Sequence, residues 1–398
     1  MSNKLRELIE YSIKNVQYYR DLNLYPKCNI EDFPLLTKTT VQNNPHSLIS
    51  DHELPNLNSL LVKSSSGSSG IPTSVYWSQN GYLQSMRSLW KCRIKFHDIY
   101  PTSMGLDFTN QSIDPNNWFS IKKNLISACG WIIDDYSKIE KLLYYVNHLN
   151  IEWIYIQPYI AMKLMSYIKE NNITLPKSLR YVEFVGEILS NEVRNEAQRV
   201  FNVPIANMYG SEEMNGIAYE CPYGTMHVLD DNVFVETLDK DEGEIIITSL
   251  TNYAMPMLRY RQGDIVVLGE KNNCSCGCNG LTIKSILGRS YEIINTHQGL
   301  INPYILTSVM EFVNRQTASQ IKQYKFIWDS RAKKMYLYIK CESNIEEVRH
   351  SIKVLVRTKL LENSLPIELK DILFKKDMPR EFGKYSILKI IGKEDAYV

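Results

Sequence analysis

Residues 151–201 read IEWIYIQPYIAMKLMSYIKENNITLPKSLRYVEFVGEILSNEVRNEAQRVF, and this stretch decides the fold class. Two apolar, β-rich runs, IEWIYIQ and YVEFVG, alternate with helical patterns near residues 161–171 and 191–201. Such alternation predicts a sheet with crossover helices. We therefore expect an α/β protein whose large amino-terminal domain mixes sheets and helices.

The chain on the carboxyl side of this stretch changes character twice. The run GEIIITS, Gly243–Ser249, begins a strand-rich and turn-rich region, which predicts a small subdomain at about residues 215–284. Beyond Gly288 we expect a hairpin, a helix that Ser343 or Asn344 could cap, and a final strand in PIELKDILF.

The length also argues for more than one domain. A chain of 398 residues is too long for one ordinary core. The best boundary is Gly288, which predicts a large domain of residues 1–287 and a small α+β domain of residues 288–398.

The bulk composition excludes several classes of protein. Lysine plus arginine count 45 and aspartate plus glutamate 44, so no global field attracts nucleic acid or anionic lipid. The amino terminus has helical spacing rather than the apolar run of a signal peptide. No apolar run is long enough to span a bilayer. We expect a cytoplasmic protein without a membrane span.

The spacing of the cysteines indicates a metal site. Cys221, His227, Cys274 and Cys276 form C-x5-H followed by C-x-C, and thiolates with one imidazole suit a closed tetrahedral zinc site. The alternative is a cysteine-rich turn with free thiols. Three cysteines at alternate positions favour structural zinc, with Cys278 either a substitute ligand or a bystander.

The run SSSGSSGIPTS, Ser64–Ser74, follows the apolar segment LNSLLV and is a candidate phosphate loop. Its glycines let the backbone approach a ligand, and its amides and hydroxyls can donate to phosphate oxygens. A mobile linker has the same composition. The loop lacks the spacing and the lysine of a Walker motif.

Three later stretches could also take part in chemistry. NMYGSEE, residues 207–213, places two carboxylates beside a glycine where a strand should end, and such acids can hold Mg²⁺. In MLRYRQGDI, Asp264 follows a tight glycine turn and could bind a ribose diol. PREFGK places Lys384 on a loop near the carboxyl terminus, although an isolated loop lysine is usually a solvated charge.

Taken in order, these motifs resemble those of the adenylate-forming ligase superfamily, and especially its phenylacetate-CoA ligase and CapK-like branch. YSIKNVQYYR and DFPLLTKTTVQNN look like the first segments of that branch. SSGSSGIPT is similar to its phosphate loop, VGE to its adenine-side turn, YGSEE to its nucleotide and magnesium motif, YRQGD to its ribose motif, GRSYEI to its hinge and PREFGK to its terminal lysine motif. The likeness covers nearly the whole chain.

The resemblance implies that ATP and a carboxylic acid form an acyl-adenylate and pyrophosphate, after which a nucleophile displaces AMP. Lys384, Glu213 and Arg289 are the implied catalytic residues, and Glu213 is the implied magnesium ligand. The implied nucleotide-binding residues are Ser65, Ser66, Gly67, Ser68, Ser69, Gly70, Gly186, Glu187, Asn207, Met208, Tyr209, Gly210, Ser211 and Asp264. The small domain is expected to move as a lid.

The sequence departs from the branch at three places. Ile71 replaces a lysine that is frequent in the phosphate loop, Glu212 adds a second charge beside Glu213, and the hinge has Tyr291 and Glu292 in place of an acidic pair. These changes keep a second hypothesis open, a nucleotide-binding relative that is catalytically impaired and acts as an accessory protein.

The substrate and the acceptor are less defined. An aryl or arylacetic acid is the first expectation by analogy, with Phe184, Tyr82 and Trp131 as candidate pocket residues. CoA, a carrier-protein thiol or an amine could accept the acyl group. Nucleic acid is not an expected partner, because the basic and aromatic stretch at residues 323–340 alternates as a half-buried hairpin does.

Overall fold

The protein was analysed as a computed structural model, which describes residues 2–25, 28–64, 73–109, 118–289, 294–296, 299–301, 306, 309–310, 313, 316–317, 321–341, 346–362, 367–375 and 388–391. The chain forms two compact units, one comprising Met1–Gln262 and Val266–Ile286 and the other Gly263–Ile265 and Leu287–Val398. The roles expected for domains 1–287 and 288–398 stay predictions.

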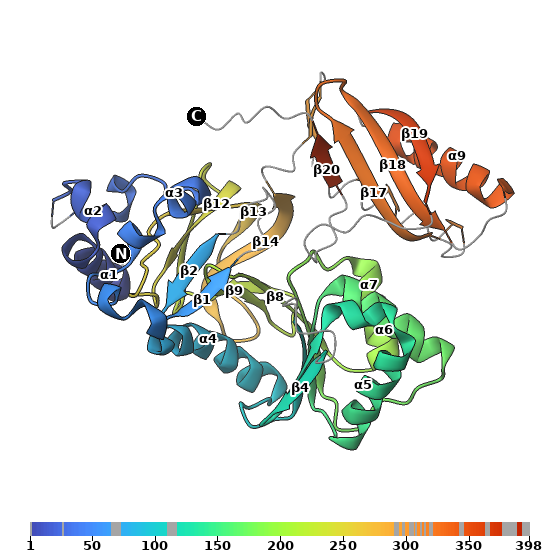
Figure 1. The fold of residues 1–398 in the computed structure, drawn as a ribbon, viewed down its shortest axis with the longest axis horizontal. Coiled ribbons are helices and arrows are strands. Elements are labelled where there is room, and N and C mark those ends of the chain that lie inside the picture. Colours follow the sequence, from blue (N-terminus) through green and yellow to red (C-terminus); the bar gives the residue numbers. More distant parts are fainter. Residues whose placement is uncertain are drawn as a thin grey trace. The chain divides into compact units, whose positions relative to one another are not determined.

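The first unit is built on a twelve-stranded sheet (Figure 1). In spatial order its strands are β11 (Val233–Thr237), β12 (Glu242–Ser249), β13 (Tyr260–Asn273), β14 (Asn279–Arg289), β10 (Met226–Val228), β9 (Asn215–Glu220), β8 (Ile205–Ser211), β7 (Tyr181–Val185), β6 (Trp153–Ile156), β3 (Gly105–Thr109), β5 (Leu125–Cys129) and β4 (Phe119–Lys122).

Five neighbouring strands of this sheet, β8, β7, β6, β3 and β5, run parallel. The predicted alternation is confirmed, because α6 (Pro158–Glu170) follows β6 and α7 (Asn191–Phe201) follows β7. Pro158 suits the first turn of α6. Ser190 caps α7 by accepting a hydrogen bond from the Val193 amide at 3.2 Å.

Helices cover both faces of the parallel strands (Figure 1). One face packs its alternate apolar residues, such as Ile154 and Phe184, against α5 (Tyr136–His148), α6 and α7. The opposite face, including Trp153 and Tyr181, packs against Leu89 of α4 (Gln79–His97). The α/β fold class is therefore confirmed.

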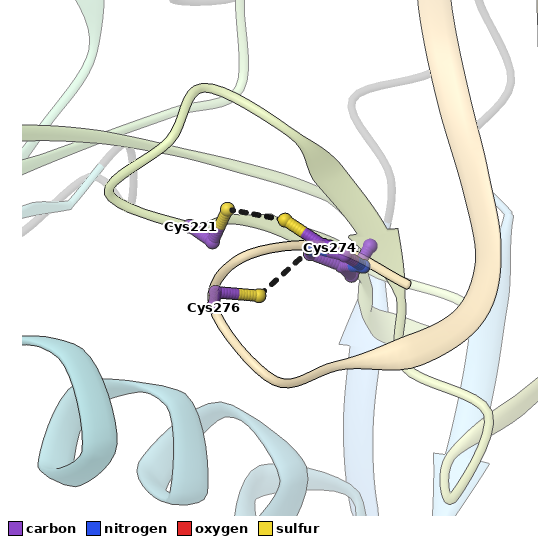
Figure 2. A group of neighbouring side chains, drawn as sticks. Cys221, Cys274 and Cys276 are labelled. Atoms are coloured by element: carbon purple, nitrogen blue, oxygen red, sulfur yellow. Dashed lines mark hydrogen bonds between the residues drawn. The ribbon is translucent and has the colours of Figure 1, made fainter. Parts of the chain in front are cut away.

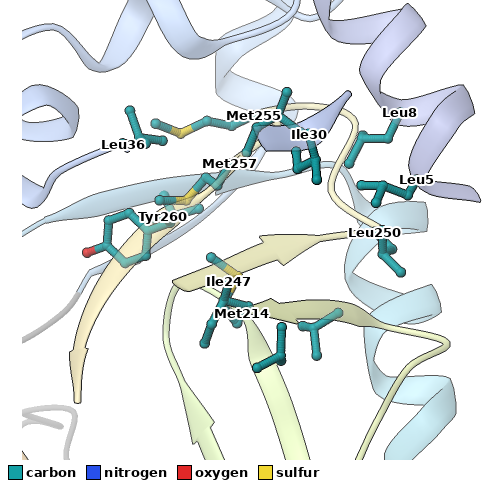
Figure 3. Close-up of a cluster of buried hydrophobic side chains, with 14 of the residues drawn as sticks. Leu5, Leu8, Ile30, Leu36, Met214, Ile247, Leu250, Met255, Met257 and Tyr260 are labelled. Carbon is teal, nitrogen blue, oxygen red and sulfur yellow. The ribbon is translucent and has the colours of Figure 1, made fainter. Parts of the chain in front are cut away.

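The amino-terminal segments extend this unit with a third hydrophobic core. They are α1 (Asn3–Asn15), α2 (Gln17–Asp21), η1 (Ile30–Asp32), α3 (Lys38–Asn43), η2 (Pro45–Leu48), η3 (Leu54–Ser59), β1 (Leu61–Ser64) and β2 (Ser74–Trp77), whereas η4 (Gly130–Asp134), later in the chain, packs with α5 and α6. Figure 3 shows Leu5 and Leu8 of α1 near Leu250, with Met255 and Met257 beside Leu36. The helical pattern at the amino terminus thus buries its apolar side in the large unit.

The second unit has its own sheet and core. Its sheet has the order β19 (Glu368–Phe374), β18 (Lys334–Cys341), β17 (Ile321–Asp329) and β20 (Leu388–Ile391), and α9 (Glu346–Glu362) contributes Ile352 and Val356 to the core. A two-stranded sheet of β15 (Ile294–Thr296) and β16 (Gly299–Ile301) precedes it. The hairpin prediction is confirmed by antiparallel β17 and β18. The proposed caps Ser343 and Asn344 lie outside the described residues.

A search of the described residues for membrane spans found no helix with both the length and the apolar character that crossing a bilayer requires.

Candidate active site

The nucleotide motif NMYGSEE occupies strand β8 and the turn that joins it to antiparallel β9. At Gly210 the two strands approach each other closely, because a Cβ at this position would stand 2.3 Å from the carbonyl oxygen of Asn215. Ser211 closes the turn, since its Oγ accepts from the Met214 amide at 3.2 Å. The strand ends at Ser211, where the sequence indicated.

The two carboxylates in this turn differ in environment. Glu213 is 6% exposed, and its Oε1 accepts a hydrogen bond from the Tyr260 hydroxyl at 3.3 Å. Glu212 is exposed. The buried, oriented carboxylate is the better candidate for holding a metal, while solvent screens the additional charge of Glu212.

The YRQGD motif lies within a strand, which corrects the expectation of a tight glycine turn before Asp264. Strand β13 continues through Tyr260–Asn273, with Gly263 at φ +87° and Asp264 buried. Pairing with β12 and β14 decides the local conformation, and the glycine supplies a positive φ inside the ladder. Ser211 Oγ donates to Gln262 Oε1 at 3.2 Å, which links this motif to the nucleotide motif.

The VGE turn follows β7 at the carboxyl edge of the parallel strands. Gly186 has φ +79°, which glycine adopts without strain. Glu187 Oε2 accepts a hydrogen bond from the Tyr159 amide at 3.0 Å, in the first turn of α6. The Glu187 carboxylate thus caps a helix, a role that the sequence did not indicate.

A carboxylate that sequence reasoning missed supports the start of the nucleotide motif. Glu220 Oε2 accepts from the Asn207 amide at 2.9 Å, and both oxygens accept from Arg194 Nη2 at 2.9 and 2.8 Å. These contacts tie α7, β8 and β9 together. Glu220 lies 13 residues after Asn207, and no local pattern reveals the contact.

Part of the predicted site falls outside the described residues. The apolar segment before the candidate phosphate loop forms strand β1, as the sequence indicated, and β1 pairs antiparallel with β2, with Ser64 opposite Ser74. The loop residues Ser65–Gly70, together with Lys384, lie outside the description, as does the side chain of Arg289.

The aromatic residues suggested for an acid pocket have different environments. Phe184 is fully buried in the core between the sheet and its helices. Tyr82 packs edge-on against Trp77 at 6.2 Å between ring centroids. The side chain of Trp131 is not among those described. Phe184 is therefore a core residue.

The predicted zinc ligands come together at two neighbouring turns. Ligand atoms of Cys221, His227, Cys274 and Cys276 all lie within 4.8 Å of one another. Cys221 Sγ is 3.8 Å from Cys274 Sγ, and Cys276 Sγ is 3.3 Å from His227 Nε2. Figure 2 shows the three cysteine side chains converging from the two loops. Three thiols and one imidazole in such a cluster fit tetrahedral zinc.

The thiols of this cluster differ, because burial raises the pKa of Cys276 to about 12 whereas the pKa of Cys274 falls. The Cys276 amide donates to Cys274 and lowers the pKa of that thiol to about 6. Cys278 stands outside the four-residue cluster and accepts a hydrogen bond from Lys95 Nζ at 3.3 Å. This contact connects the cysteine turn to α4. The Nδ1 atom of His227 has no partner among the described residues, whereas metal-bound histidines usually donate from that second nitrogen.

A buried ion pair joins α4 to β7, and no local sequence pattern indicated it. Arg93 Nε and Nη2 donate to the two oxygens of Glu183 at 2.9 and 2.7 Å, and both side chains are buried. The Tyr181 and Tyr219 hydroxyls donate to the same carboxylate at 2.7 and 3.2 Å. Burial would raise the pKa of Glu183, but Arg93 outweighs that effect and the net shift is downward.

Comparison with curated proteins found distant relatives. The chain is 24% identical to Protein CapK of Staphylococcus aureus over 334 residues, covering 78% of this chain and 72% of that protein. It is 25% identical to the phenylacetate-coenzyme A ligase of Thermus thermophilus over 323 residues, covering 73% of this chain and 70% of the relative. No family model matches.

Comparison with solved structures shows the same fold. A 2-hydroxyisobutyryl-CoA ligase in the postadenylation state, in complex with 2-HIB-AMP, superimposes with a TM-score of 0.75 at 13% identity. The match covers 97% of this chain and 88% of that one. The chain is therefore related to the phenylacetate-CoA ligase and CapK-like branch of the adenylate-forming ligase superfamily, as the order of its motifs predicted.

Proposed function

We propose that this chain uses ATP to convert a carboxylic acid to its acyl-adenylate, with release of pyrophosphate, and then transfers the acyl group to a thiol or an amine. The observation that carries the proposal is the buried Glu213 carboxylate, held by Tyr260 in the turn after β8. In open α/β sheets, ligands bind outside the carboxyl ends of parallel strands, and the VGE turn and NMYGSEE both lie there.

The proposed catalytic roles follow from charge. Negative charge develops as the acid attacks the α-phosphate of ATP, so Lys384 would stabilise the transition state and Arg289 would assist at the hinge. The amides and hydroxyls of Ser65–Gly70 would donate to the phosphates. Asp264 would accept hydrogen bonds from the ribose.

Glu213 is the proposed ligand for Mg²⁺, which would neutralise phosphate charge. Its burial and its hydrogen bond from Tyr260 support this role. Cys221, His227, Cys274 and Cys276 are the proposed ligands of a structural zinc ion.

CoA is the first candidate acceptor, because relatives of this chain are named phenylacetate-coenzyme A ligases. A carrier-protein thiol and an amine are the other candidates. The same names favour an active ligase over an impaired nucleotide-binding relative.

The test is acid-dependent exchange of labelled pyrophosphate into ATP, screened over aryl, fatty and amino acids. We expect at least one acid to support exchange, and Lys384→Ala to lower the rate by about 10²–10³-fold because a transition-state cation is lost. Lys370→Ala, at an exposed position on β19, is the matched control and should leave the rate unchanged.

A null result with every acid, despite ATP binding with magnesium, would favour the impaired relative. For the second step, adding CoA should yield an acyl thioester that mass spectrometry detects. A free acyl-adenylate that persists with CoA present would direct attention to an amine or carrier protein.

A further inference from the structure

Two hydrogen-bond acceptors near the carboxyl edge of the parallel strands lack a partner within the described part of the chain. They are Oε1 of Gln157, directly after β6, and Oδ1 of Asp107 in β3, and both atoms are shielded from solvent. Native proteins rarely leave buried polar atoms unsatisfied, and a ligand is one common reason for the exceptions.

The Gln157 amide has a fixed orientation. Its side chain is 8% exposed, and Nε2 donates to the carbonyl oxygen of Phe108 at 3.1 Å. Rotating the amide by half a turn would place two oxygens together, so Oε1 is the end that stays available as an acceptor. A ligand group that meets this oxygen must be a donor.

Gln157 lies among the strand ends that carry the nucleotide motifs. A Cβ at Gly186 would stand 3.6 Å from Gln157 Cγ, so the side chain lies beside the VGE turn. The bond to Phe108 places it beside β3 as well. Gln157 therefore lies where β3, β6 and β7 end.

Asp107 supplies a second acceptor on the next strand. It is opposite Tyr155 in the parallel pairing of β3 with β6, and its carboxylate accepts a hydrogen bond from Ser127. The other oxygen, Oδ1, has no partner in the described residues. Two neighbouring strands thus each present an unsatisfied acceptor.

The strand order assigns these acceptors to the acid rather than to ATP. The neighbours run β8, β7, β6, β3, and the nucleotide motifs are at the ends of β8 and β7. With strands about 4.8 Å apart, β6 and β3 lie one and two spacings beyond β7. In the described part of the chain no nucleotide motif lies at this part of the edge, which fits the second substrate.

We propose that the acid activated by this chain carries a hydroxyl or amino group, which donates a hydrogen bond to Gln157 Oε1, with Asp107 as a second acceptor. An unsubstituted aryl or fatty acid would leave both acceptors without a partner among the described residues. This inference rests on the proposed ligase function and narrows its substrate class.

Specificity of this kind can be large. A site built to hydrogen-bond a substrate discriminates strongly against an analogue that lacks the group, because its own polar atoms stay unpaired. A purely apolar pocket distinguishes such analogues weakly.

The test is pyrophosphate exchange with matched acids, namely phenylacetate and a branched short-chain acid, each unsubstituted, hydroxylated and aminated. We expect wild-type protein to favour a substituted acid by at least about tenfold in kcat/KM. Gln157→Met has a similar volume and no carboxamide oxygen, so it should reduce the preference to within about threefold. Comparison of the hydroxylated acids with the aminated acids identifies which group is the donor.

Several results would overturn the inference. Equal kcat/KM for substituted and unsubstituted acids would do so, as would an unchanged preference in Gln157→Met. A raised KM for ATP with unchanged acid preference would assign Gln157 to the nucleotide instead. If no acid supports exchange, the ligase proposal fails and this inference fails with it.

A second variant, at Asp107, tests the inference if Gln157→Met folds poorly. Asp107→Leu has a similar volume and no acceptor, so it should weaken the preference by several fold, whereas full retention in this variant would also count against the inference.

Discussion

The cysteine cluster and the Arg93–Glu183 pair fix the large unit in two different ways. The cluster gathers three thiols and an imidazole that gain little from one another without a cation. The ion pair is complete in itself, because Arg93 and two tyrosine hydroxyls satisfy Glu183. With the proposed zinc ion, one fixed point would depend on the metal supply, whereas the other depends only on the chain.

The two regions also differ in how a sequence reveals them. Cysteine is rare, and three cysteines at alternate positions stand out. Arg93 and Glu183 are 90 residues apart and belong to ordinary helix and strand patterns. Rare residue types therefore reveal a site before folding is known, while common charged residues do not.

Breaking the ion pair should have the largest effect on stability. Arg93→Met leaves a buried, uncompensated carboxylate and should lower the free energy of unfolding by about 3–5 kcal/mol, measured by urea denaturation. Lys91→Ala, which removes an exposed pair between the same helix α4 and Asp231, should cost less than about 1 kcal/mol.

The double variant Arg93→Met/Glu183→Gln should recover part of the loss, since the buried charge is gone. If the double variant is as unstable as the single one, lost packing of Arg93 between Trp90 and Trp153 explains the effect better than charge does.

Metal removal should have the next largest effect. Protein purified without added metal should contain one zinc ion per chain by elemental analysis, and a chelator should lower the free energy of unfolding by at least about 2 kcal/mol. Cys276→Ser should reproduce both changes. Cys278→Ser is the matched control and should keep the zinc, because its sulfur lies outside the ligand group.

Sub-stoichiometric zinc, together with stability that a chelator does not change, would show that the cluster is a set of free thiols. Loss of zinc in Cys278→Ser would instead make Cys278 a ligand.

A smaller, pH-dependent effect is expected beside the ion pair. The His97 ring stacks on Tyr181 at 4.1 Å between centroids, and burial lowers the pKa of His97 to about 4, with Glu183 opposing and Arg93 adding to the shift. His97 is protonated at a higher pH in the unfolded chain than in the folded one. Its contribution to the free energy of unfolding is therefore complete above pH 6.5 and is lost as the pH falls toward about 4.

The resulting change in the free energy of unfolding is below about 1.4 kcal/mol per pH unit, since His97 is only partly buried. His97→Asn should flatten the wild-type dependence between pH 7 and 5 in denaturation experiments, an interval set by the shift from 6.5 to about 4. Identical pH profiles would exclude His97 as a contributor.

Local pattern was sufficient for much of the fold. The alternating elements from β6 to α7 followed from apolar spacing, and the hairpin of β17 and β18 from alternation. The prediction of a turn before Asp264 was wrong. Glycine permits a turn but does not require one, and pairing of β13 with β12 and β14 keeps this segment in a strand.

The candidate site was less accessible to prediction. Sequence order supplied the nucleotide motifs but not the partners that hold them, such as Glu220 beneath Asn207 or Tyr260 beside Glu213. These contacts join residues whose proximity exists only after the sheet has formed.

Gly210 has a consequence for how such motifs are interpreted in other chains. Its missing side chain is required by the approach of β9, whatever ligand the turn binds. A protein that had lost ATP binding altogether would still need glycine there to keep β8 and β9 together. Glycine at this position is thus a marker of shared architecture, and the neighbouring carboxylate is the more informative sign of retained chemistry.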